Sequence, residues 1–258
     1  MKKILILIAV IILGIGLYKL VFKQKHMTIQ DVISDMSEIG IYPISHATAL
    51  INWGEEVIYT DPVGGAKAFA GLDEPGIILV TDIHSDHLSI ETLSAIVKEN
   101  TVIIAPKAVA DLLPEKLLVK TVVSANGEKT TQKGFSIEAV PMYNLPEDPK
   151  SFHTKGRGNG YVVEKSGKRL YIAGDTSGTP EMRALKNIDI ALVPMNLPYT
   201  MSVEEAVSAV LDFAPREVYP YHYRGINGLS DVNKFKELVN AGNPNIAVEL
   251  LNWYPETK

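Results

Sequence analysis

Four side chains that can bind a metal ion lie within six consecutive positions: Asp82, His84, Asp86 and His87, soon after the apolar stretch 76–80. Side chains alternate between the two faces of a strand, so Asp82 and His84 can point the same way. A turn after His84 then lets Asp86 and His87 reach a second position nearby. Imidazole and carboxylate groups bind zinc, manganese and iron, and the absence of cysteine excludes thiolate ligands. The spacing predicts a metal site at the end of a buried strand.

A simpler interpretation of the same segment is a polar loop that caps a helix. Asp86 or Ser89 can provide the cap, and Ser89 with Glu91 in the first helical turn is typical of one. Capping alone gives no reason for two histidines and two aspartates together. We therefore favour the metal site.

Two more candidate ligands follow strands elsewhere in the chain. Asp175 comes after Gly174 at the end of the expected strand 169–173, and His222 follows the expected strand 217–221. Taken singly, each residue is more typical of a turn or of a hydrogen-bonded core position. A metal-capable residue directly after a strand in three places indicates one shared site.

The elements that must position these residues alternate between strand and helix. Crossovers and hairpins together imply a layered α/β domain in which loops at strand ends hold the site. Strands are expected at 41–44, 49–52, 56–60, 77–81, 102–105, 119–124, 136–140, 161–164, 169–173, 188–194, 217–221 and 246–251. Helices are expected around 29–37, at 90–98, at 107–113, from 203 to 211 and at 232–239.

Composition and charge narrow the class of partner. The chain has 258 residues, of which 46% are hydrophobic and 21% charged, enough for one large globular domain. Its formal net charge is −5 and its lysines and arginines form no long cluster, so no nucleic-acid partner is expected. A small-molecule substrate is the expected partner.

The N-terminal residues 4–22 form a nearly continuous apolar run interrupted by Lys19. If Lys19 extends its charged end to the lipid headgroups, this run approaches the ~20 residues that span a bilayer as a helix. A cleaved signal peptide is the competing interpretation, but no cleavage site of small residues follows the run. We therefore expect a transmembrane helix that is retained.

This expectation divides the chain into two parts. Residues 1–26 are a membrane anchor with its linker, and residues 27–258 are the globular domain. Lysines on both sides of the apolar run specify the orientation only weakly. We expect the globular domain to lie outside the cytoplasm, tethered to the membrane through residues 4–22.

In their order and strand context these motifs resemble the metallo-β-lactamase fold superfamily, and the chain is most similar to its lactonase-like branch. That branch includes the N-acyl phosphatidylethanolamine phospholipases. The resemblance covers most of the chain from about 41 to 253. The motifs that carry it are Asp61-Pro62, Asp82-x-His84-x-Asp86-His87, Gly174-Asp175-Thr176, His222, Ser45-His46-Ala47 and the segment 152–158.

The resemblance implies a four-layer αββα sandwich with a site for two divalent ions, most readily zinc, with manganese or iron as alternatives. By motif position, Asp86, His87 and His222 hold one ion, Asp82 and His84 contribute to the other, and Asp175 bridges both.

The chain departs from the family pattern in two places. The first histidine of the family motif is replaced by Asp82, and Tyr143 stands near the place of another usual histidine ligand. His153 is the nearest substitute for that ligand. For His46 and His153 the alternatives of metal ligand and substrate-pocket residue stay open.

The chemistry expected of such a site is hydrolysis by a metal-activated hydroxide on an ester, lactone or phosphodiester. Asp86 is expected to orient the hydroxide, while Tyr143, Asn144, His153 or Tyr221 supports developing charge in catalysis. Arg157 and other basic residues of the late loops could bind an anionic group, although a solvated loop is the simpler interpretation. The alternative function is a membrane-tethered metal-binding or sensing domain without turnover.

Overall fold

The computed structural model describes residues 38–255. The predicted anchor at residues 4–22 and the predicted helix around 29–37 lie outside the described residues. Within the described range, no helix has the length and apolar character needed to cross a bilayer.

Two sheets form the centre of the molecule. The first contains six strands in chain order, of which β1 to β3 are antiparallel and β3 to β6 are parallel. Its strands are β1 Ile39–Ser45, β2 Thr48–Trp53, β3 Glu56–Thr60, β4 Ile77–Leu79, β5 Val102–Ala105 and β6 Thr121–Val123.

The second sheet contains seven strands in the order β15-β12-β11-β10-β9-β8-β7. Neighbours from β15 to β10 run parallel, and those from β10 to β7 run antiparallel. Its strands are β7 Lys129–Gln132, β8 Phe135–Met142, β9 Gly158–Lys165, β10 Lys168–Ile172, β11 Ile190–Pro194, β12 Glu217–Tyr221 and β15 Ala247–Val248, and a separate hairpin joins β13 Arg224–Gly225 to β14 Gly228–Leu229.

Alternation along the strands buries both faces of the first sheet. On β4, Ile77 and Leu79 enter the core shared with the second sheet, whereas Ile78 lies in a separate core on the opposite face. A continuous apolar run is typical of a strand covered on both faces. A buried strand that leads into the metal motif is therefore confirmed, although β4 ends at Leu79, two residues before the predicted end at 81.

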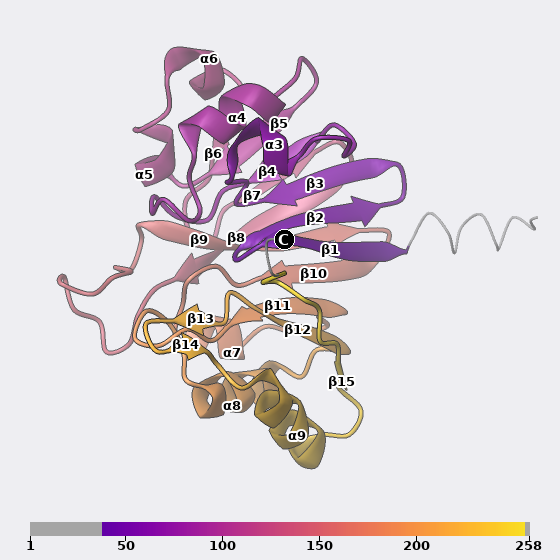
Figure 1. Ribbon diagram of the computed structural model, residues 1–258, viewed down its shortest axis with the longest axis vertical. Coiled ribbons are helices and arrows are strands. Elements are labelled where there is room, and N and C mark those ends of the chain that lie inside the picture. Colours follow the sequence, from indigo (N-terminus) through magenta and orange to yellow (C-terminus); the bar gives the residue numbers. More distant parts are fainter. Residues whose placement is uncertain (1–37, 256–258) are drawn as a thin grey trace, which may run out of the picture. The chain divides into compact units, whose positions relative to one another are not determined.

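Helices cover the outer face of each sheet, so the described residues form the predicted αββα order of layers. Figure 1 shows α4, α5 and α6 on one side of the molecule and α8 and α9 on the other. The helices are α3 Gly65–Ala68, α4 Ile90–Ile96, α5 Lys107–Ala110, α6 Glu115–Leu118, α7 Pro180–Arg183, α8 Val203–Phe213 and α9 Val232–Gly242.

A hydrogen bond confirms the predicted cap at Ser89, and Ser202 caps α8 in the same way. The Ser89 hydroxyl accepts from the backbone nitrogen of Thr92 at 3.2 Å, and the Ser202 hydroxyl accepts from that of Glu205 at 3.1 Å. Each bond satisfies a backbone donor that the first turn of a helix leaves without a partner. Ser89 thus caps α4 while the residues before it remain free to form a site.

Several elements differ from the sequence prediction. The short helices α3, α6 and α7 and the hairpin of β13 and β14 were not predicted. The edge strand β7 was missed because Lys129–Gln132 contains no apolar residue. The predicted strand 246–251 reduces to Ala247–Val248, the residues in parallel register with β12. The predicted helix 107–113 ends as a regular helix at Ala110.

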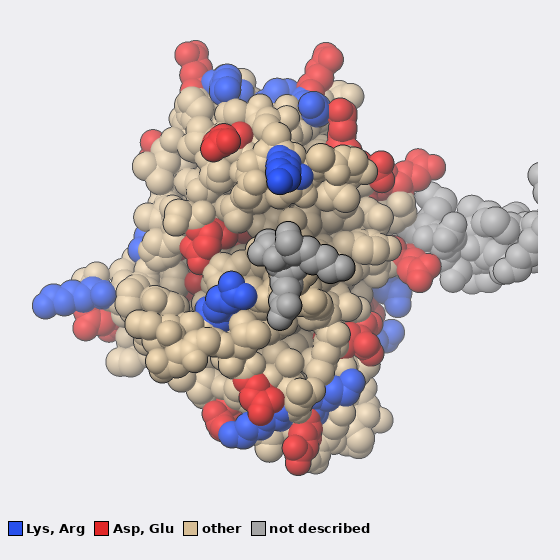
Figure 2. All heavy atoms as spheres, in the orientation of Figure 1, with Lys and Arg blue, Asp and Glu red and all other residues tan. Residues whose placement is uncertain are grey.

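Charged side chains are dispersed on the face shown in Figure 2. Lysines and arginines stand singly or in small groups near acidic residues, and no continuous basic surface covers the part of this face that the described residues form.

Candidate metal centre

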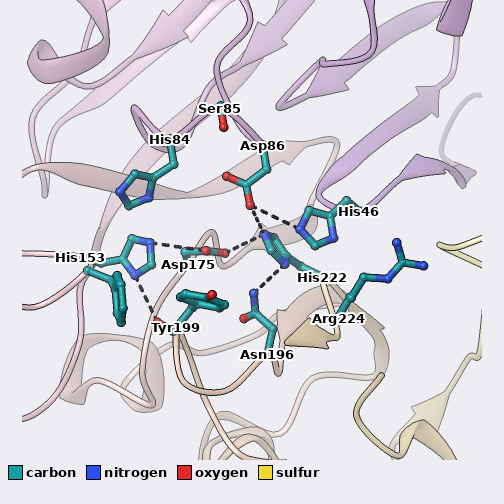
Figure 3. A pocket seen from close by; sticks show the side chains of 11 residues that line it. His46, His84, Ser85, Asp86, His153, Asp175, Asn196, Tyr199, His222 and Arg224 are labelled. Carbon is teal, nitrogen blue, oxygen red and sulfur yellow. Dashed lines mark hydrogen bonds and ion pairs between the residues drawn. The ribbon is translucent and has the colours of Figure 1, made fainter. Parts of the chain in front are cut away.

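A cavity of about 290 Å³ opens where the strand ends of the two sheets meet. The turn between β1 and β2 contributes His46, the loop after β4 contributes His84 and Asp86, and the loop before β9 contributes His153 (Figure 3). The remaining lining residues are Ser85, Phe152, Asp175, Asn196, Tyr199, His222 and Arg224. Residues far apart in the sequence therefore converge on one hollow.

His87 is fixed behind the cavity by a fully buried network. Its Nδ1 lies 2.8 Å from Oδ2 of Asp61, while the hydroxyl and backbone nitrogen of Thr81 donate to the two Asp61 oxygens at 2.7 Å each. With Nδ1 engaged, Nε2 is the His87 nitrogen that faces the cluster. Partners of this kind fix the orientation of metal-binding imidazoles in proteins.

Asp175 lies at the centre of the cluster. Its Oδ2 is 3.5 Å from Nε2 of His87 and 3.4 Å from Nε2 of His153, and its Oδ1 is 3.4 Å from Nε2 of His222. Gly174 allows this close approach, because its φ is +65° and an added Cβ would lie 2.4 Å from the sulfur of Met142. One carboxylate is thereby shared by two groups of histidines.

His222 and Asp86 complete one side of the cluster. Nε2 of His222 lies 3.2 Å from Nε2 of His87 and 3.4 Å from Oδ2 of Asp86, and its Nδ1 contacts the Asn196 amide at 2.8 Å. Asp86 also lies 3.3 Å from Nε2 of His46, whose Nδ1 is 2.7 Å from the Tyr254 hydroxyl.

The other side contains Asp82, His84 and His153. Oδ2 of Asp82 lies 2.7 Å from Nδ1 of His84 and 3.7 Å from Nε2 of His153. His153 is held by its loop, because its backbone nitrogen donates to Asn144 and its Nδ1 lies 3.2 Å from the carbonyl oxygen of Tyr199. His153 therefore points into the cluster from the long connection between β8 and β9.

Arg157 contacts Asp82 instead of standing in a solvated loop. Its Nε donates to Oδ1 at 3.1 Å and its Nη2 donates to Oδ2 at 3.0 Å. The same Nη2 donates to the carbonyl oxygen of Phe152 at 2.5 Å. The simpler interpretation of Arg157 is therefore wrong.

Tyr143 does not reach the cavity. Its hydroxyl donates to Glu181 at 2.9 Å and accepts from the ammonium group of Lys155 at 3.2 Å, and it is absent from the cavity lining. The structure thus separates Tyr143 from the other residues that were expected to act in catalysis, Asp86 and His153. The Tyr221 side chain is also buried, and its hydroxyl accepts from the backbone nitrogen of Gly174.

The protonation of the cluster follows from its crowded charges. Burial would lower the pKa of His87, but the negative charges of Asp175 and Asp61 raise it well above the usual value. Burial would likewise raise the pKa of Asp175, but His222 and His87 hold it below its usual range. Burial lowers the pKa of His153, which favours the neutral imidazole. The cluster thus stabilises carboxylates in their charged form, the form that binds cations.

Two buried atoms support a cation at this place. Nε2 of His153 and Oδ1 of Asp175 have no hydrogen-bond partner among the described residues. A polar atom that is buried without a partner is destabilising, and a metal ion would provide the partner for both. Three sets of side chains bring their ligand atoms within 4.8 Å of one another: His46, Asp86 and His222; Asp82, His84 and His153; and His87, Asp175 and His222.

Some functional residues had little signal in the sequence. Asp61 was noted only as part of an Asp-Pro pair after a strand, yet it anchors His87. The positive φ of Asp61, +44°, places its carboxylate beneath the cluster. Asn196 and Tyr199 lie in the loop after β11. No sequence motif marks this loop as part of the site.

The chain is similar in sequence to known protein families. The model of the Beta-lactamase superfamily domain matches residues 41–222. A UPF0173 metal-dependent hydrolase of Pyrococcus abyssi is 33% identical over 207 residues, covering 76% of this chain and 90% of that protein.

Solved structures share the fold. A crystal structure named as a metal-dependent hydrolase of Parabacteroides distasonis has a TM-score of 0.72 and 35% identity, and the match covers 82% of this chain and 92% of that chain. A metallo hydrolase of Ignicoccus hospitalis has a TM-score of 0.70 at 21% identity, covering 83% and 95% of the two chains, and shows the fold alone. The chain therefore belongs to the metallo-β-lactamase superfamily, among its metal-dependent hydrolases.

Proposed function

We propose that the cavity holds two divalent ions and that the protein hydrolyses an ester, lactone or phosphodiester there. The observation that carries this proposal is the convergence of histidines and aspartates on Asp175, with two buried atoms that lack partners. Zinc is the proposed metal because imidazole predominates among the ligands, and manganese or iron are alternatives.

The distances support a division of the ligands into two sets. Asp86, His87 and His222 form the first set. Asp82, His84 and His153 form the second, in which His153 fills the position that the sequence left open. Asp175 contacts residues of both sets and is proposed as the bridge.

A divalent cation at such a site lowers the pKa of water from ~15.7 to ~7 and so supplies hydroxide at neutral pH. The protein's own residues orient the reaction. Asp86 is 39% exposed to the cavity and can accept a proton from the attacking water. His46 contacts Asp86 and the Tyr254 hydroxyl, so we propose His46 as the residue that positions Asp86 and not as a ligand.

The cavity walls suggest the kind of substrate. Phe152 and Tyr199 meet edge to face with their ring centroids 5.0 Å apart, and Arg224 lies at the opposite part of the lining (Figure 3). An ester with an apolar part and an anionic group fits these walls. Such a substrate accords with the lactonase-like and phospholipase-like branch, which is part of the proposal.

The N-terminal apolar run supports a location for this activity. Residues 4–22 have the composition of a membrane-spanning helix. We propose that they anchor the hydrolase domain at a membrane, outside the cytoplasm. Fractionation of cells that express the full chain, followed by protease treatment of intact cells, tests both parts.

Metal analysis combined with hydrolysis assays tests the proposed function. The full chain is assayed for bound metal and for turnover of a p-nitrophenyl ester, a lactone and bis(p-nitrophenyl) phosphate. We expect about two ions per chain, and loss of turnover in His87→Ala. The matched control is His26→Ala, which replaces a histidine that belongs to none of the motifs. Bound metal with no turnover on any class would favour the sensing domain and contradict the hydrolase.

A further inference from the structure

The most unusual part of the cluster is the buried pair of Asp82 and Arg157. The Asp82 side chain is 0% exposed, whereas Arg157 retains 21% exposure. Moving a carboxylate out of water without an opposite charge costs several kcal/mol even after the protein relaxes. Arg157 provides that charge through two parallel hydrogen bonds, the strongest arrangement available to this pair.

The two Asp82 oxygens have different surroundings. Oδ1 accepts from Nε of Arg157, while Oδ2 accepts from Nη2 of Arg157 and faces His84 and His153. Oδ2 is the Asp82 oxygen that lies near both histidines, 2.7 Å from His84 and 3.7 Å from His153. The guanidinium group thus occupies one side of the carboxylate and leaves one oxygen directed at the cluster.

Arg157 is itself held in place from behind. Its Nη2 donates to the carbonyl oxygen of Phe152, and its backbone nitrogen donates to the carbonyl oxygen of Thr154 at 3.2 Å. Gly156, with φ +85°, allows the tight turn between them. The same short loop carries His153, so the orientation of Arg157 and that of His153 depend on one segment.

We propose that Arg157 is a positioning residue that makes Asp82 equivalent to a neutral ligand with a single donor atom. The pair offers the cluster one oxygen and no net charge, as a neutral imidazole offers one nitrogen and no net charge. With Asp86 and Asp175 already present, a third uncompensated carboxylate would favour hard cations over zinc. Arg157 compensates this additional negative charge. The pair of Asp82 and Arg157 therefore determines which metal occupies the second set of ligands. This inference rests on the proposed function.

The proposal predicts that residues 82 and 157 are coupled in metal binding. Zinc and manganese affinities are measured by competition with a chromophoric chelator on the full chain, without any substrate. Comparison of Asp82→Ala with the wild type first shows which of the metal-binding steps requires Asp82. In Arg157→Gln we expect that step to weaken for zinc by about 10–100-fold, the usual effect of removing a partner of a ligand, with a smaller loss for manganese.

The same Arg157→Gln change made in Asp82→His separates two roles of Arg157: positioning of Asp82, and structural support of the loop as a whole. In Asp82→His the imidazole needs no opposite charge, so adding Arg157→Gln to it should leave the zinc affinity unchanged or raise it. Lys155→Gln is the matched control, because it removes a cation from the same loop whose contacts are Tyr143, Glu147 and Glu181. Circular dichroism and thermal unfolding in chelator show that each variant folds.

The outcomes distinguish this inference from the proposed function. Equal losses from Arg157→Gln in both backgrounds would show a structural role of the loop and overturn the inference. Unchanged zinc affinity in Arg157→Gln, or no binding step lost in Asp82→Ala, would overturn it as well. If the wild-type chain binds neither metal, the proposed function fails first and the inference fails with it.

Discussion

The two sides of the metal cluster are built in different ways. On one side, His87 and His222 follow β4 and β12 and are buried, and each has a fixed partner behind it, Asp61 or Asn196. On the other side, His84 is 39% exposed and His153 comes from the long loop between β8 and β9. The first side is anchored in the sheets, whereas the second depends on a loop and on Arg157.

This difference indicates which part of the site tolerates change. Ligands at strand ends are placed by the same hydrogen bonds that hold the fold, so altering them should cost both stability and metal. Ligands on a loop can change their chemistry with little cost to the fold. His153 lies on such a loop, and Asp82, although it follows β4 and is buried, depends on Arg157 from the same loop.

Removal of the shared carboxylate should give the largest effect. Asp175 contacts histidines of both sides, so Asp175→Ala should lose both ions and reduce turnover by about 10³–10⁴-fold, equivalent to ~4–5 kcal/mol of transition-state stabilisation. His153→Ala should keep one ion. Mass spectrometry of the metal content with parallel assays measures both. If Asp175→Ala keeps one ion, Asp175 is not the bridge.

Asp61 tests the anchored side without replacing a proposed ligand. Asp61→Ala leaves the buried His87 and Thr81 without their partner, and we expect the free energy of unfolding to fall by about 3 kcal/mol. Urea denaturation of the metal-free chain measures the loss.

The control for Asp61 is a carboxylate that also interacts with a basic side chain at short distance but is exposed to solvent. Glu164 accepts from Arg169 at 2.7 Å and is 42% exposed, so Glu164→Ala should cost less than about 1 kcal/mol. Similar costs for the two variants would show that the network beneath His87 is not a special anchor.

His84 tests the loop side by the same measurement, the free energy of unfolding. Because it is 39% exposed and its partner Asp82 keeps Arg157, we expect His84→Ala to change the free energy of unfolding by no more than about 0.5 kcal/mol. Zinc affinity at the second set of ligands should nevertheless fall. A loss of stability comparable to that of Asp61→Ala would remove the distinction between the two sides.

Much of the fold could be predicted because its strands bury both faces. Runs such as 77–80 and 190–194 are apolar throughout, which fixed the central strands. The polar edge strand β7 carries no such pattern and depends on pairing with β8. Edge elements of this kind are set by tertiary contacts that a local pattern does not contain.

The site was predictable where ligands directly follow strands. Asp82 to His87, Asp175 and His222 were found in this way, and the structure brings their metal-capable side chains into one cluster, in which His84, Asp86, Asp175 and His222 line the cavity and Asp82 and His87 lie buried behind it. Arg157 could not be placed, because its contact with Asp82 spans 75 positions and arises from a loop turn at Gly156. Tyr143 was misplaced because it lies at the end of β8 but directs its hydroxyl towards Glu181.

Arg224 should give the smallest effect and the clearest information on substrate. Its guanidinium lies 4.2 Å from the Tyr254 ring centroid and has no ion pair with a carboxylate among residues 38–255. Hydrogen bonds to charged groups contribute about 1.5–3 kcal/mol, and exposure reduces this, so Arg224→Gln should raise KM for an anionic substrate by about tenfold with kcat unchanged.

The comparison of two substrates makes this prediction specific. A neutral ester has nothing for Arg224 to bind, so its KM should be the same in Arg224→Gln and in the wild type. Because Arg224 lies on the β13 hairpin and outside both ligand sets, metal content should also stay constant. An equal rise in KM for both substrates would mean that Arg224 shapes the cavity through Tyr254 and His46 and does not select an anionic group.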